Sequence, residues 1–228
     1  MTFKMPLLFA ALVAAATGAV ADARACGYFD YRQVRPAVHV QPKPAPIPAS
    51  ERIAAADQRL EEEHLTEAGL RVVTAFPHIR SISVGASPLE TRALRILSLA
   101  VVRAGGAIPG AAGFSATREA ERGANLEWAA SALRSINAAR SNDPLAQADL
   151  AEALASQPQH EDESLALLAD LASRDLLGSA HAYATLARLQ ASRGDTTASR
   201  TALDRCELMT RTPASVCRVP NARLAIRG

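Results

Sequence analysis

The chain has 228 residues, of which 49% are hydrophobic but only 4% aromatic, and alanine supplies much of the apolar content. Alanine favours helix and lets backbones approach closely, but it buries little surface per residue, so this composition favours many small helix contacts over one deep core. The net charge of +2 comes from 25 basic and 23 acidic residues that are interspersed without a basic block, which excludes the electrostatic footprint of a nucleic-acid-binding protein.

Residues 1–25 have the pattern of a secretory signal peptide. A single cation, Lys4, precedes an apolar run over 7–20, and alanines at 19, 21, 23 and 25 fit the small-x-small pattern of a cleavage site. An uncleaved membrane anchor is the alternative, but the run is short for a span of about 20 residues. The sequence therefore predicts an exported protein, periplasmic or secreted, from which residues 1–25 are removed.

Cleavage directly before Cys26 raises a second possibility, a lipid-anchored envelope protein. A bacterial lipid-attachment box usually carries Leu three residues before the cysteine and a small residue just before it. Here these positions hold Ala23 and Ala25, with the charged Arg24 between them. The lipid anchor is therefore the less favoured alternative, and we expect membrane contact only if Cys26 is lipidated.

Residues 26–49 are expected to form an extended linker, because proline stands at alternate positions of QPKPAPIP over 41–48 and blocks helix. Beyond this segment helix-start signals recur. Ser87-Pro88-Leu89-Glu90 combines an N-cap serine, a proline in the first helical position and a capping-box glutamate, and Asp143-Pro144 offers a similar start. Residues 79–84 are a weak candidate for a strand.

One spacing pattern recurs in four of the predicted helices. Each contains a small, a large and an apolar residue at positions i, i+4 and i+7, which lie on one helix face. The four sets are Ala68-Val72-Ala75, Ala132-Ile136-Ala139, Ser164-Leu168-Leu171 and Ser199-Leu203-Cys206. Their small members are 64, 32 and 35 residues apart, and a period in the low thirties indicates repeated helical hairpins.

Residues 180–213 resemble a tetratricopeptide repeat (TPR). The matching positions are Tyr183, Leu186 and Ala187 in the first helix, Gly194-Asp195 in the turn, and Ser199, Leu203 and Cys206 in the second helix. Gln190 replaces the later first-helix aromatic of the family, and the closing proline, Pro213, comes late. The resemblance implies an all-α domain over residues 50–213, built from antiparallel helical hairpins stacked as a short α-solenoid and followed by a C-terminal tail over 214–228. A non-repeat helical bundle is the alternative.

Small residues are expected to let the two helices of a hairpin approach, with Ala187 lying against Ser199 and Cys206 further along. No hairpin buries its apolar face alone, so each needs a neighbour. Residues 105–113, GGAIPGAAG, interrupt the array, and paired glycine and proline predict a flexible loop there.

Cys206 and Cys217 are the natural disulfide pair in an oxidising compartment, because they are close in the sequence and flank a turn that contains proline. The alternative is that Cys206 is a free, buried thiol. The sequence contains no CxxC pair, so we expect no structural zinc site.

We expect no catalytic residues, no cofactor and no metal site. The five histidines include no HExxH pair, no serine lies in a GxSxG turn, and neither glycine-rich phosphate motif is present. The polar run from His160 to Glu163 is interpreted as a solvated turn. An enzyme whose site forms across several hairpins is the remaining alternative.

His181 and Arg188 lie seven residues apart, on one face of a helix in the repeat that matches best. The resemblance implies that such first-helix positions contact extended peptides or partner helices, and an arginine there is suited to holding a carboxylate. A solvated helix face is the alternative. The sequence therefore predicts a protein-binding or scaffold module with a protein or peptide partner in the cell envelope.

Overall fold

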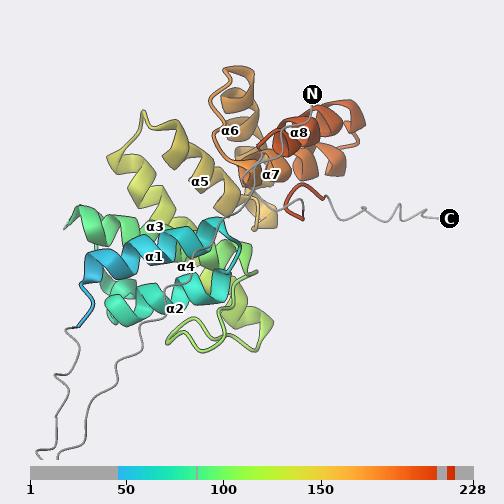
Figure 1. The fold of residues 1–228 in the computed structure, drawn as a ribbon. Helices are drawn as coiled ribbons and strands as arrows, with labels where there is room; N and C mark the ends of the chain where they lie inside the picture. The colour runs from blue at the N-terminus through green and yellow to red at the C-terminus, as the bar shows by residue number, and fades with distance from the viewer. Residues whose placement is uncertain (1–45, 86, 210–214, 219–228) are drawn as a thin grey trace, which may run out of the picture. The chain divides into compact units, whose positions relative to one another are not determined.

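The computed structural model describes residues 46–85, 87–209 and 215–218, so the predicted signal peptide, Cys26 and most of the predicted linker lie outside the described residues (Figure 1). The described part contains eight α-helices and two short 3-10 helices. Their bounds are α1 Ala49–Glu61, α2 Leu65–Ala75, η1 Ile79–Ser81, α3 Pro88–Arg103, α4 Glu119–Ala139, α5 Pro144–Leu154, η2 Pro158–His160, α6 Glu161–Ser173, α7 Ala180–Ser192 and α8 Thr196–Glu207.

The helices pack in sequence order, which confirms the prediction of an all-α, solenoid-like fold. Four hairpins form from α1 with α2, α3 with α4, α5 with α6, and α7 with α8, and each second helix also packs on the helix that follows it. The helices α1, α3, α5 and α7 additionally pack on one another in that order. We call these four the first-helix row. None of the described helices is both long enough and apolar enough to cross a membrane.

Local signals set several of the helix starts. The Ser87 hydroxyl accepts a hydrogen bond from the Glu90 amide at 3.4 Å, and the Asp143 carboxylate accepts one from the Leu145 amide at 3.0 Å, so α3 and α5 begin where the capping residues predict. Helix α1 begins at Ala49, inside the predicted linker by one residue. The segment 79–84 contains the 3-10 helix η1, and no strand lies there.

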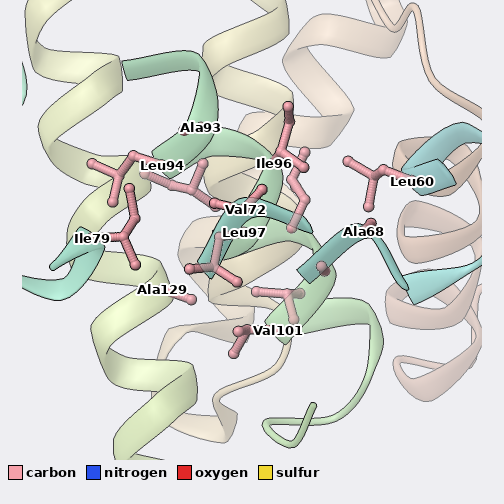
Figure 2. Close-up of a cluster of buried hydrophobic side chains, with 14 of the residues drawn as sticks. Leu60, Ala68, Val72, Ile79, Ala93, Leu94, Ile96, Leu97, Val101 and Ala129 are labelled. Carbon is pink, nitrogen blue, oxygen red and sulfur yellow. The ribbon is translucent and has the colours of Figure 1, made fainter. Parts of the chain in front are cut away.

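Two hydrophobic clusters form the interior, and α5 belongs to both. The first cluster gathers residues of α1 to α5, including Leu60, Val72 and Leu97 (Figure 2). The second gathers residues of α5 to α8 with Cys217. Helix α5 contributes to both because Leu150 faces the first cluster, whereas Ala148 and Ala151 face the second. In Figure 1 it accordingly runs between α1–α4 and α6–α8.

Small residues occupy the helix contacts in the second cluster, as predicted. Ala187 and Cys206 are completely buried, Ser199 is 6% exposed, and α7 packs closely on α8. Ser164 is also completely buried, and its hydroxyl donates to the Ala151 carbonyl of the neighbouring helix at 2.6 Å. A methyl or hydroxymethyl group at these positions allows the backbones to approach.

The predicted register of α4 is wrong. Ala139 is exposed and Ala132 only half-buried, whereas the buried small-large-apolar set is Ala129-Leu133-Ile136, three residues earlier. With this correction the small residues of α4, α6 and α8 are each 35 residues apart. The buried small residues of these three helices are therefore more evenly spaced than the sequence pattern indicated.

The segment 104–118 is not helical, in agreement with the loop predicted over 105–113. It is not a flexible surface loop, however, because its large apolar side chains are buried. Ile108 and Phe114 are completely buried, and the Ile108 amide donates to the Phe114 carbonyl at 2.9 Å. The Asn125 side chain donates to the Gly106 carbonyl at 2.9 Å. Gly106 has φ +85°, and a Cβ there would lie 2.5 Å from the Arg122 carbonyl oxygen, so only glycine fits.

Candidate functional site

Ion pairs join successive helices of the first-helix row. The pairs are Asp57 with Arg92, Arg95 with Asp149, and Arg103 with Glu152. They place charge on the faces where α1 meets α3 and α3 meets α5. Because each pair uses an arginine of α3, that helix lies at the centre of these ion pairs.

The Arg103–Glu152 pair is buried and bidentate. The Arg103 Nε and Nη2 atoms donate to the two Glu152 carboxylate oxygens at 2.7 and 3.1 Å, and the side chains are only 11% and 7% exposed. Burial opposes ionisation of Glu152, but the charge and hydrogen bonds of Arg103 outweigh it and hold the pKa of Glu152 below its usual value of 4.5. Glu152 is therefore a carboxylate at neutral pH.

Asp149 lies one turn earlier on α5 and accepts two hydrogen bonds from Arg95. Burial raises the pKa of Asp149 above its usual value, and the nearby charge of Glu152 raises it further, while Arg95 offsets part of this rise. Both carboxylates thus lie in one buried, mutually interacting cluster between α3 and α5.

A polar cleft of about 630 Å³ opens beside this cluster. Helices α3, α5 and α7 line it, together with the α1–α2 turn and the segment that holds Ser215 and Val216. Its lining residues are Glu63, Val102, Arg103, Glu152, Ala155, Ser156, His181, Thr185, Arg188, Ser215 and Val216. The structure therefore brings both predicted partner-binding residues, His181 and Arg188, to one cleft.

His181 contacts a residue far away in the sequence. Its Nε2 atom lies 2.6 Å from a carboxylate oxygen of Glu63, 118 positions earlier, and the two side chains are 17% and 25% exposed. Glu63 follows α1 in the left-handed region, with φ 63°, a conformation that is uncommon for a residue other than glycine. The contact connects the first hairpin to the last.

Arg188 already contacts two groups of the chain itself. Its Nη2 atom donates to the Ala155 carbonyl at the end of α5 at 2.7 Å, and its Nη1 atom lies 3.6 Å from the Glu161 carboxylate. From the sequence we expect Arg188 to meet either a partner's carboxylate or solvent. The structure shows a third arrangement, in which Arg188 joins α7 to the α5–α6 corner.

A second hollow of about 590 Å³ is also lined by His181, and we call it the leucine groove. It is lined by Asp57, Leu60, Glu61, Arg95, Leu99, Arg103, Leu145, Gly178, Ser179, Ala180, His181, Leu208 and Met209. Arg103 and His181 line both hollows. The polar cleft and the leucine groove therefore meet at these two side chains.

The Cys206–Cys217 disulfide is present, as the sequence predicted, with Cα atoms 5.7 Å apart. Both cysteines are buried in the second hydrophobic cluster. The bond ties the segment after α8 to the last helix, and Ser215 and Val216 of that segment line the polar cleft. The disulfide thus fixes one wall of the cleft.

Sequence reasoning missed the acidic residues and Arg103 of this site. The available signal was charge in an apolar context, since Asp149 and Glu152 stand among alanines and leucines in α5, PLAQADLAEAL. The position of Glu63 has no comparable local signal, because its partner His181 belongs to another hairpin.

The polar run from His160 to Glu163 lines neither hollow, although Glu161 reaches Arg188. Glu161 to Glu163 form the first turn of α6, where acidic side chains suit the helix dipole, so the expected solvated turn is the start of a helix. The described ranges contain no group of three histidine, cysteine, aspartate or glutamate side chains placed to hold a metal ion.

Comparison of the chain with protein-family models, with curated proteins and with solved structures finds no match.

Proposed function

We propose that this chain is an exported, TPR-like interaction or scaffold protein, which holds a protein or peptide partner in the cell envelope without catalytic turnover. The observation that carries the proposal is the polar cleft along the first-helix row, with His181 and Arg188 on its wall. Clefts of this size between packed elements are typical binding sites. Export is supported by the signal-like pattern over 1–25 and by the Cys206–Cys217 disulfide, because disulfides persist mainly in oxidising compartments.

Thr185 offers the sharpest test, because it lines the cleft between His181 and Arg188 on the same helix. Thr185→Arg fills the cleft, whereas Thr201→Arg places the same side chain on the exposed surface of α8. The full-length protein and both variants are used for affinity capture from envelope extracts. We expect a partner that the wild type and Thr201→Arg retain and Thr185→Arg loses. Equal retention by both variants contradicts a role for the cleft.

The lipid-anchored form of the same fold is the alternative for the N-terminus, since Cys26 follows the predicted cleavage site. Mass spectrometry of the mature protein separates the two. An unmodified N-terminus supports the exported, unanchored form, whereas a diacylated Cys26 supports the lipid-anchored form.

A second candidate function, an enzyme with a site formed across hairpins, is favoured by one observation. Glu63, Glu152 and His181 come from three different hairpins and line the same cleft, next to hydroxyl groups such as that of Thr185. Converging titratable side chains of this kind are found in active sites. Turnover of an ester or peptide substrate by the wild type, abolished by His181→Gln, would favour this candidate over the binding module.

A further inference from the structure

We propose that the partner segment presents a cationic side chain next to a large apolar side chain, and that this pair binds where the polar cleft meets the leucine groove. The inference rests on the proposed function and adds the chemistry of the partner to it. It is carried by the charge that remains uncompensated at the junction and by the exposed leucines beside it.

Every arginine that lines either hollow has a carboxylate partner. Arg103 is paired with Glu152, Arg95 with Asp149, and Arg188 lies 3.6 Å from Glu161. The positive charge of each of these guanidinium groups is therefore already balanced by a carboxylate of the chain itself.

Two carboxylates that line the hollows, one in each, form no ion pair with an arginine among the residues that the structure describes. Glu63 is paired with the imidazole of His181. The charge of Arg103 interacts with both Glu152 and Glu63. Glu61 is exposed, lines the leucine groove, and forms no ion pair with any residue in the described ranges. Acidic charge thus exceeds basic charge here, which favours a partner cation and disfavours a partner anion.

Exposed apolar side chains gather at the same place. Leu145 and Leu208 are 44% and 71% exposed, and both line the leucine groove together with Met209. Among the residues that the structure describes, Ile47 is the only other large hydrophobic side chain with comparable exposure. Large apolar side chains exposed together mark a contact surface, and they match an apolar side chain of a partner.

This proposal differs from the carboxylate-binding role that the sequence resemblance implies for Arg188. An acidic segment entering the polar cleft would meet Glu63 and find Arg188 bonded to the Ala155 carbonyl. A Lys or Arg side chain meets Glu61 and Glu63 instead, and the neighbouring apolar side chain of the partner covers Leu145 and Leu208.

The probes are three short, fluorescently labelled peptides with blocked ends: alternating Lys-Leu, alternating Glu-Leu and alternating Lys-Ser. Their binding to the full-length, oxidised protein is measured by anisotropy at low and at physiological salt. We expect Lys-Leu to bind most tightly, with an affinity that falls as salt rises, Lys-Ser to bind more weakly, and Glu-Leu not to bind.

Variants locate the binding. Glu61→Gln should weaken Lys-Leu binding about two- to fivefold, as for an exposed ion pair, and Leu208→Ser should weaken it as well. Glu127→Gln removes an exposed carboxylate from α4, outside both hollows, and should change nothing.

Three results overturn the inference: tighter binding of Glu-Leu than of Lys-Leu, equal effects of Glu61→Gln and Glu127→Gln, or no binding of any peptide. If one of them occurs while a captured partner still depends on Thr185, the proposed binding function stands and only the partner chemistry is wrong. If the captured partner is also insensitive to Thr185→Arg, both fall.

Discussion

The substitution Glu152→Gln tests the buried charge of the first-helix row most sharply. It keeps the size of the side chain but removes the negative charge that faces Arg103, whose side chain is only 11% exposed. Removing one partner of a buried pair leaves an uncompensated charge, which typically costs 3–5 kcal/mol. Because the glutamine amide can still accept one hydrogen bond from Arg103, we expect a loss near the lower limit, about 3 kcal/mol in the free energy of unfolding.

The assay is urea unfolding followed by far-UV circular dichroism. Glu163→Gln is the matched control, because Glu163 also faces an arginine, Arg134, but at 3.9 Å with both side chains about half exposed. Exposed pairs contribute little, so the control should unfold close to the wild type. The double variant Arg103→Met with Glu152→Leu removes both charges and should regain most of the lost stability. Equal stability of Glu152→Gln and Glu163→Gln would refute the reasoning.

Four further predictions concern stability. The pKa of Glu152 is lower in the folded than in the unfolded state, so its stabilising contribution is complete above the unfolded pKa and is lost as the pH falls through the folded pKa. The free energies of unfolding of the wild type and of Glu152→Gln should therefore differ at pH 7 and converge in strong acid. Ala187→Leu overpacks the α7–α8 contact and should cost about 1–3 kcal/mol in chemical unfolding; an unchanged midpoint would contradict that contact. Replacing Cys206 and Cys217 by serine should cost about 3 kcal/mol, measured against the oxidised wild type. Gly106→Ala should lower the melting temperature. An unchanged melting temperature would mean that the Arg122 carbonyl can move away from the added methyl group.

Features set by neighbouring residues could be predicted from the sequence. The caps at Ser87 and Asp143 depend on hydrogen bonds to residues two or three positions away, and the proline that follows each of them fixes the first turn. The small residues Ala187 and Ser199 lie in adjacent helices of one hairpin, so their burial could be predicted from their spacing in the sequence.

Features set by distant contacts could not be predicted. Helix α4 has small residues on several faces, so its buried register depends on which face α3 covers. The spacing pattern predicts burial of Ala132, whereas Ala129 is the buried residue. The Glu63–His181 contact closes only after four hairpins have stacked. His181 and Arg188 line one cleft, and their partners belong to the α1–α2 turn, the end of α5 and the start of α6, which no local pattern indicates.

The central claim is that the cleft along the first-helix row receives a partner. A photo-crosslinking amino acid at Thr185, which lines the cleft, is compared with one at Ser173, an exposed residue at the end of α6 outside both hollows. The full-length protein carrying each label is irradiated in the cells that produce it. We predict a discrete crosslinked species from position 185 and none from position 173. Identical patterns from the two positions, or no product from position 185, would contradict the claim.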